Sequence, residues 1–296
     1  MALKAASMPL GGLSAAGTGA RGGGALVQPL PRSLARPLAP PQRMWQRQQQ
    51  QGSRSTWAAV GSVAAFCTAG SSSAAACKEK RPKSITVYYG DLPFWRAECV
   101  RMSLFIGGVA FDDKRDQKRD ELKAEGKLAF GATPVMEVDG KMLSQTQAMA
   151  AFAGRLSGLY PGDDAWLAAK VDEAINGCTD ITTTISGTMR LPADDKVKAR
   201  EALIAPEGRL TMHLGGLERL ISENGHPGFV VGSSITVADL AIWRLVGWVS
   251  SGVIDGIPMD YVAKTFPQIQ GLCEQVDAHP KVQEWKAKYD KFYGKK

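Results

Sequence analysis

The sequence predicts a small α/β layer with a mixed sheet, then an all-helical region, both behind a disordered leader. Period-two apolar segments alternate with helical segments between Ser84 and Gly158. From Ala165 onward, apolar residues recur with helical spacing, and no segment reads as a convincing strand. The first 80 residues are rich in Ala, Gly, Ser, Pro and Gln. We therefore expect a leader over residues 1–80 and domains over residues 83–160 and 165–296.

The first domain opens with a strand and a helix. Ile85, Val87 and Tyr89 alternate with Thr86 and Tyr88, which indicates a strand. After the break "GDLP", residues 95–107 carry apolar positions with helical spacing and end at two consecutive glycines. The segment "VAFDD" reads as a second strand, and the charged residues 114–127 as a solvated helix or loop.

The first domain closes with a hairpin and a helix. Two apolar segments of "TPVMEVDGKML" flank Asp139-Gly140, a dipeptide typical of two-residue hairpin turns. The segment "SQTQAMAAFAGRLSG" then predicts a helix that ends at Gly158. The order of elements over this domain favours a mixed sheet flanked by helices.

The second domain contains long helical patterns only. Thr236 and Asp239 of "SITVADL" have the spacing of a capping box, and Ile235 and Leu240 that of the accompanying hydrophobic staple. This motif predicts the start of a buried helix. The expected helices cover residues 165–189, 196–221, 237–247 and 268–278, and one further segment after Pro280.

The leader accounts for the basic composition. The chain has a formal net charge of +7, yet no Asp or Glu precedes Glu79. The remainder is almost neutral, which argues against a nucleic-acid partner. An acid-free leader containing Arg and Ser is typical of a transit peptide to a plastid or mitochondrion. A disordered tail on a cytoplasmic protein is the alternative, and the mildly apolar residues 57–70 are too few for a membrane span.

The cysteines argue against metal or dithiol chemistry. Five are present, of which Cys67 and Cys77 lie in the leader. The other three, Cys99, Cys178 and Cys273, are widely spaced and form no CxxC pair or Cys/His cluster. We therefore expect no metal site and no dithiol redox site.

Three segments of the first domain, taken in order, resemble one enzyme family. The segments "YYGDLPFWRAE", "FGATPVMEVDG" and "LSQTQAMAAF" resemble the N-terminal domain of soluble, tyrosine-type glutathione S-transferases. The similarity is greatest to the sigma-like class, which includes glutathione-dependent prostaglandin D synthase. It covers roughly residues 84–289 and implies a thioredoxin-like N-terminal domain followed by a helical C-terminal domain.

The resemblance implies that a tyrosine at the end of the first strand activates the glutathione thiol. A thiol with a pKa near 8.5 is only about 3% ionised at pH 7. A hydrogen bond to the anion, worth about 1.5–3 kcal/mol, lowers that pKa by roughly one to two units. Strand phase favours Tyr89 over the neighbouring Tyr88, and Arg96 matches the family arginine that supports the tyrosine.

Two further segments match the family's glutathione-binding positions. Pro134 resembles the family's cis-proline, which would orient the backbone of Thr133 to pair with an extended peptide. Gln145 and Thr146 precede and begin a helix, where free backbone donors and a hydroxyl suit an anion. In the family these positions hold the γ-glutamyl carboxylate, usually with Ser where this chain has Thr146.

Other positions match the family less closely. The resemblance places Lys123 beside glutathione, although this segment has Arg119 where many relatives have Trp. Asp180 lies near the position from which a partner subunit's acid contacts the γ-glutamyl amino group. The electrophile is expected between the two domains, where the candidate residues are Phe94, Trp95, Thr183 and Met189, each of which could instead be a core residue.

The sequence thus predicts a homodimeric glutathione transferase. Glutathione would be its co-substrate and a small hydrophobic electrophile its partner, with peroxidase or isomerase activity also open. The alternative is a non-catalytic binding or structural protein with the same fold, which the longer "GDLPFW" loop and the missing Trp leave open.

Overall fold

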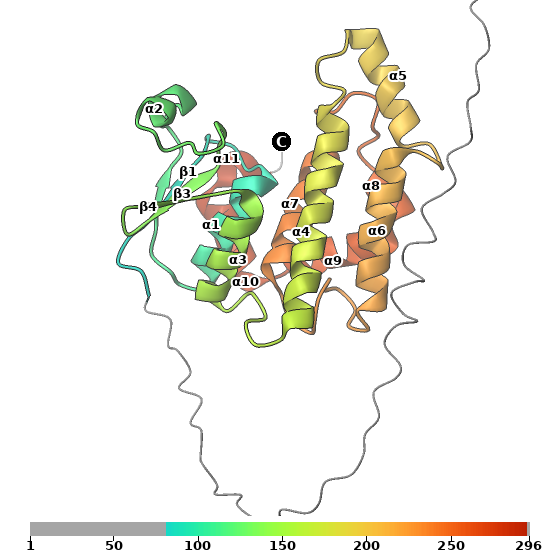
Figure 1. The fold of residues 1–296 in the computed structure, drawn as a ribbon. Coiled ribbons are helices and arrows are strands. Elements are labelled where there is room, and N and C mark those ends of the chain that lie inside the picture. The colour runs from blue at the N-terminus through green and yellow to red at the C-terminus, as the bar shows by residue number, and fades with distance from the viewer. Residues whose placement is uncertain (1–80, 295–296) are drawn as a thin grey trace, which may run out of the picture. The chain divides into compact units, whose positions relative to one another are not determined.

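The structure, a computed structural model, describes residues 81–294, and the leader assigned to residues 1–80 lies outside this range. A four-stranded sheet with flanking helices comes first in the chain, and a group of helices follows it (Figure 1). This arrangement confirms the expected fold class, a mixed sheet followed by a helical region. None of the helices among residues 81–294 has the length and hydropathy needed to cross a membrane.

The sheet is mixed, with strand order β2-β1-β3-β4. Its strands are β1 (Ile85–Tyr88), β2 (Asp112–Lys114), β3 (Val135–Val138) and β4 (Lys141–Ser144). β1 pairs parallel with β2 and antiparallel with β3, which pairs antiparallel with β4. Asp139 and Gly140 both have positive φ, 48° and 78°, so the predicted tight hairpin turn between β3 and β4 is confirmed.

Alternate residues of β1 face opposite sides of the sheet. Ile85 and Val87 belong to the main hydrophobic core, whereas Tyr88 packs with Leu122 and Val135 in a small second cluster. The main core also contains buried residues of α1 and α3, and Leu122 belongs to α2. The flanking helices are α1 (Trp95–Ile106), α2 (Arg119–Ala124) and α3 (Thr146–Ser157).

The second strand differs from the sequence prediction. Residues 109–111 of "VAFDD" are not part of β2, which begins at Asp112. The reason is that Val109 donates its backbone N–H to the Leu104 carbonyl at 2.9 Å, which closes the end of α1. Only after this turn does the chain reach the register in which Asp112 pairs with Thr86.

The helical region contains long helices in the expected segments, one of them divided in two, and two short helices that the sequence patterns missed, α8 and α11. Its elements are α4 (Ala165–Ser186), α5 (Ala193–Leu203), α6 (Arg209–Glu223), α7 (Val237–Val249), α8 (Tyr261–Thr265), α9 (Pro267–Asp277), α10 (Pro280–Lys288) and α11 (Asp290–Tyr293). α4 and α6 lie side by side (Figure 1), and α7 contacts both α4 and the sheet's α1.

The single helix expected over residues 196–221 is wrong, because the chain forms two helices there. Pro206 has no N–H and disfavours helical geometry at the residue before it. The chain then turns sharply at Gly208, where a Cβ atom would stand 2.2 Å from the carbonyl oxygen of Leu203. The break separates α5 from α6.

The predicted capping box starts α7, as expected. Asp239 accepts hydrogen bonds from the Thr236 backbone N–H at 2.6 Å and from its hydroxyl at 2.7 Å. The same carboxylate accepts from the Val230 N–H at 2.8 Å. Burial raises the pKa of Asp239 to about 6, although these hydrogen bonds favour the ionised form. The cap thus fixes one end of the most buried helix of the region.

Candidate functional site

A cavity of about 170 Å³ lies where α1, β4 and α3 meet the loop before β3. Five of the residues predicted to act on glutathione line it, and they come from separate segments. These are Arg96, Thr133, Pro134, Gln145 and Thr146. The fold therefore brings together the parts of three sequence motifs that lie up to 50 residues apart. Phe130, Ala132 and Ser144 complete the lining and carry no signal that the sequence patterns could detect.

The wall formed by Gln145 and Thr146 suits an anion. Gln145 is the N-cap of α3 with φ 73° and ψ 123°, and its side chain makes no capping hydrogen bond. Positive φ at a residue other than glycine costs roughly 1–2 kcal/mol and is concentrated at functional sites. The first N–H groups of the twelve-residue α3 have no partner within the helix, and the helix dipole adds positive potential there.

The opposite wall carries free backbone groups. The Thr133–Pro134 peptide bond is cis, as the resemblance led us to expect. The registered pairs of β3 begin at Val135, so Thr133 lies beyond the sheet ladder. Among residues 81–294, no loop hydrogen bond uses the backbone of Thr133. An extended peptide could therefore pair with it.

Arg96 supplies the positive charge of this cavity. Its guanidinium lies 5.1 Å from the ring centroid of the neighbouring Trp95, and within residues 81–294 it forms no ion pair. Burial lowers the pKa of Arg96, and the nearby Tyr89 partly opposes that shift. A cation left without a carboxylate beside a cavity is suited to an anionic ligand.

The two adjacent tyrosines differ sharply in their surroundings. The Tyr88 hydroxyl donates to Glu137 Oε2 at 3.0 Å and accepts from Lys127 Nζ at 3.2 Å. Tyr89 follows the end of β1, and the Arg101 guanidinium lies 5.8 Å from its ring centroid. The hydroxyl of Tyr88 is therefore occupied on the α2 side of the sheet, whereas Tyr89 lies towards α1 and Arg96.

The Tyr89 hydroxyl keeps its proton at neutral pH. Burial raises the pKa of Tyr89 above its usual value, and the charges of Arg96 and Arg101 oppose this rise. A protonated hydroxyl is a hydrogen-bond donor, and the two cations strengthen its attraction for an anion. Tyr89 can thus donate to a thiolate bound beside Arg96.

Two predicted glutathione contacts lie away from this cavity. Lys123 is exposed on α2, and Asp180 lines a separate open groove of about 690 Å³ between α4 and α6. That groove contains none of the motif residues from the sheet. The size of this groove does not make it the glutathione site, because Arg96 and the other motif residues line the smaller cavity at the start of α3.

The residues predicted to hold an electrophile differ in burial. Trp95 is fully buried and donates its indole N–H to Thr182 Oγ1 at 2.8 Å, so it is a core residue joining α1 to α4. Phe94 is half-buried and meets the edge of Trp248, with ring centroids 5.2 Å apart. Thr183 and Met189 are exposed on and just after α4. Trp248 is an aromatic neighbour that sequence reasoning missed.

The cysteines of the described range are not nucleophiles. Burial raises the pKa of the Cys99 and Cys273 thiols to about 12 and also raises that of Cys178. Such thiols stay protonated at neutral pH and are inert. Between residues 81 and 294, no cluster of three or more His, Cys, Asp or Glu side chains could hold a metal ion.

Comparison with known proteins shows consistent similarities. Residues 179–289 match the family described as "Glutathione S-transferase, C-terminal domain". The chain is 30% identical to glutathione S-transferase 1 of Ascaris suum over 199 residues, covering 66% of this chain and 91% of that protein. It is 28% identical to glutathione S-transferase alpha-1 of Rattus norvegicus over 193 residues, or 64% and 82% of the two chains.

A solved structure shares the fold. The structure of prostaglandin synthase D of Nilaparvata lugens covers 69% of this chain and 98% of its own, with a TM-score of 0.59 and 23% sequence identity. At that level of identity the match supports the fold only.

Proposed function

The chain belongs to the glutathione S-transferase family and is a transferase enzyme, and from that premise we propose that Tyr89 activates the glutathione thiol. The observation that carries the proposal is that Arg96, Thr133, Gln145 and Thr146 line one cavity. Tyr89 lies near Arg96, and the charge of each group, when ionised, shifts the pKa of the other. We infer tyrosine-type chemistry of the sigma-like class, since the three segments that contain Tyr89, Pro134 and Gln145 resemble that class, although the loop between Tyr89 and Arg96 is longer than usual and Thr146 replaces the usual Ser.

Glutathione would bind as an extended peptide. Its γ-glutamyl carboxylate would accept hydrogen bonds from the start of α3 and from the Thr146 hydroxyl, and its cysteinyl backbone would pair with Thr133. The cysteinyl sulfur would then point towards Arg96 and Tyr89. The thiolate then attacks a soft electrophile, and the same anion could reduce a peroxide or assist an isomerisation.

The available interactions suffice energetically. Lowering a thiol pKa by about two units requires roughly 2.7 kcal/mol of preferential stabilisation of the anion. A charge-assisted hydrogen bond from one hydroxyl contributes about 1.5–3 kcal/mol. The Tyr89 hydroxyl, with Arg96 and Arg101 nearby, can therefore supply the shift without a metal ion.

Thr146→Val tests the binding site in the full chain. Removing this hydroxyl should raise the KM for glutathione by roughly tenfold to a hundredfold, because it deletes a hydrogen bond to a carboxylate. The matched control is Thr179→Val on α4, whose hydroxyl, among residues 81–294, donates only to the Ile175 carbonyl of its own helix. Retention on immobilised glutathione and conjugation of an aryl halide are the measurements.

The possible outcomes separate the two candidate functions. Wild-type retention with turnover that falls in Thr146→Val supports the proposed enzyme. Retention without turnover on a panel of electrophiles and peroxides would instead identify a non-catalytic binding protein. Equal KM values for wild type and Thr146→Val would show that glutathione does not bind at α3.

Assembly and destination are further proposals. We infer a homodimer, supported by the family habit and by the open α4–α6 groove, where Met212 is 62% exposed and Asp180 is available to a partner. Light scattering of the purified chain tests this, and a monomer at micromolar concentration would contradict it.

The acid-free leader supports import into a plastid or mitochondrion. A fluorescent fusion that stays cytoplasmic would contradict that destination.

A further inference from the structure

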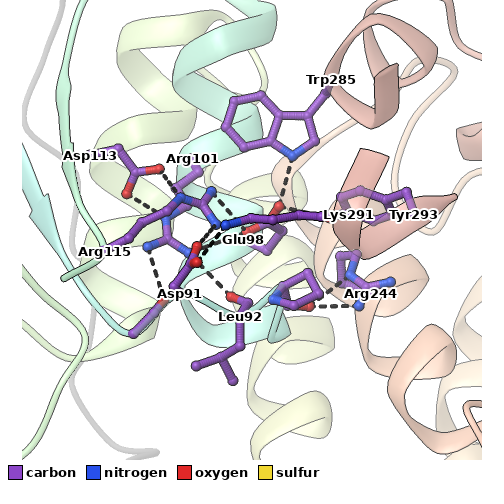
Figure 2. A network of polar contacts seen from close by, with 12 residues as sticks. Asp91, Leu92, Glu98, Arg101, Asp113, Arg115, Arg244, Trp285, Lys291 and Tyr293 are labelled. Carbon is purple, nitrogen blue, oxygen red and sulfur yellow. Dashed lines mark hydrogen bonds and ion pairs between the residues drawn. The ribbon is translucent and has the colours of Figure 1, made fainter. Parts of the chain in front are cut away.

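The four-residue loop that follows Tyr89, Gly90–Pro93, is held by cations along its whole length (Figure 2). Arg101 donates to the carbonyls of Gly90 at 3.5 Å and Leu92 at 3.4 Å. Arg244 of α7 donates twice to the Pro93 carbonyl, at 2.9 and 2.6 Å. A loop fixed at three of its four carbonyls cannot move without breaking these bonds.

The side chain of Asp91, the remaining residue of the loop, is held as well. Its carboxylate forms ion pairs with Lys291 at 2.5 Å and with Arg115 at 3.6 Å. Lys291 belongs to α11, so the last turn of the described chain touches the loop directly. The Lys291 and Asp91 side chains are both largely exposed, and such a pair alone contributes little.

The stronger connection to the C-terminus runs through buried groups. Arg101 is completely buried, and Glu98 at 3.3 Å and Asp113 at 2.9 Å neutralise its charge. Glu98 is also fully buried and accepts hydrogen bonds on Oε1 from the Trp285 indole and the Tyr293 hydroxyl, both at 2.7 Å. Buried ions depend on having every partner in place.

Tyr293 of α11 is connected to both arginines that hold the loop, Arg101 and Arg244. Its hydroxyl reaches Glu98, the partner of Arg101. Its ring stacks on Trp243, with centroids 5.9 Å apart and planes at 14°, and the Arg244 guanidinium lies 5.1 Å from its centroid. Burial and the charge of Glu98 raise the pKa of Tyr293, so its hydroxyl remains a donor.

We propose that Tyr293 is a positioning residue for thiol activation, acting through Glu98 and Arg101 on the loop that fixes Tyr89. The inference rests on the proposed function of Tyr89. Its physical basis is alignment, because a hydrogen bond weakens steeply once donor and acceptor are displaced or bent. A displacement of about 1 Å at a catalytic group can cost on the order of a hundredfold in rate.

This arrangement also explains how the loop "GDLPFW", longer than is usual in the family, can serve catalysis. The extra length would loosen Tyr89 if the loop were anchored only at its ends. Here Arg101, Arg244 and Lys291 fix it from α1, α7 and α11. Two of these three contacts come from helices more than 150 residues further along the chain.

Tyr293→Phe in the full chain tests the proposal. The substitution removes the hydroxyl bond to Glu98 and keeps the ring contacts with Trp243 and Arg244. The matched control is Tyr289→Phe, the same chemical change four residues earlier. The Tyr289 hydroxyl makes no hydrogen bond to other residues in the range 81–294, while its ring packs on Trp285 at 4.5 Å.

Two readouts separate positioning from a general structural role. Tyr293→Phe should lower kcat for an aryl halide and the ultraviolet absorbance of enzyme-bound thiolate at pH 7 together, by about 1.5-fold to threefold, as a rise of 0.5–1 unit from a thiol pKa near 6.5 requires. The KM for glutathione should stay at the wild-type value, because the α3 site is untouched. Tyr289→Phe should match wild type in all three measurements.

Each other result overturns the proposal. Wild-type kcat and thiolate absorbance in Tyr293→Phe would show that α11 does not position Tyr89. A lower unfolding temperature with unchanged thiolate absorbance would assign Tyr293 to stability alone. A wild-type enzyme that binds glutathione without forming thiolate would overturn the proposed function itself, and the positioning role with it.

Discussion

Replacing Tyr89 with phenylalanine removes one hydroxyl beyond the end of β1 and keeps the ring beneath the Arg101 guanidinium, 5.8 Å from its centroid. If this hydroxyl donates to the thiolate, its loss costs about 1.5–3 kcal/mol of anion stabilisation. The thiol pKa then returns to about 8.5, a rise of about one to two units, and thiolate at pH 7 falls roughly eightfold to 25-fold. Conjugation should fall by the same factor.

The neighbouring tyrosine gives a matched control. Tyr88→Phe removes a hydroxyl bonded to Glu137 and Lys127 on the other side of the sheet. Losing these bonds should lower the free energy of unfolding by about 1 kcal/mol. Turnover and bound thiolate should be unchanged, since Glu137 and Lys127 occupy the Tyr88 hydroxyl on the α2 side of the sheet, whereas Tyr89 lies towards Arg96 and Arg101.

The assay compares kcat, the KM for glutathione and the pH dependence of conjugation for both variants. Activity of Tyr89→Phe should recover as pH rises towards the ordinary thiol pKa near 8.5, because hydroxide then ionises the thiol without the hydroxyl. The KM should change little in either variant. Full activity in Tyr89→Phe together with loss of activity in Tyr88→Phe would refute the reasoning.

Two further predictions concern stability. The folded-state pKa of Asp239 is raised from 3.8 to about 6, so its contribution to stability declines as pH rises between these values. In urea unfolding, the difference between wild type and Asp239→Asn should shrink by up to about 3 kcal/mol across that window, and a constant difference would contradict the buried ionisation. Thr182→Val leaves the buried Trp95 indole N–H without its acceptor and should cost about 1–3 kcal/mol. The exposed neighbour Thr183→Val should stay within about 0.5 kcal/mol of wild type, and equal losses in both variants would refute that account.

Local sequence patterns predicted most elements because local backbone preferences produce them. The alternation in β1, the Asp139-Gly140 turn and the Thr236–Asp239 capping box each involve residues within a few positions of one another. The failures arose where a nearby contact outweighed periodicity. Closure of α1 by Val109 displaced the start of β2, and Pro206 with Gly208 split the expected long helix.

The sequence alone also singled out Arg96, Thr133, Pro134, Gln145 and Thr146, which the fold then gathers around one cavity. It did so because each belongs to a short segment that resembles a glutathione-binding segment of the family. The sequence could not show that Trp95 is a core residue, or that Lys123 and Asp180 lie away from that cavity.

What only the tertiary structure decided is how the loop after Tyr89 is held. Tyr293 meets Glu98 across 195 positions of sequence, and Lys291 meets Asp91 across 200. Contacts between such distant residues leave no periodic trace in the chain, since neither partner's local conformation depends on the other. They form only when α1, α7 and α11 pack together, because packing brings the buried carboxylate of Glu98 within reach of its donors.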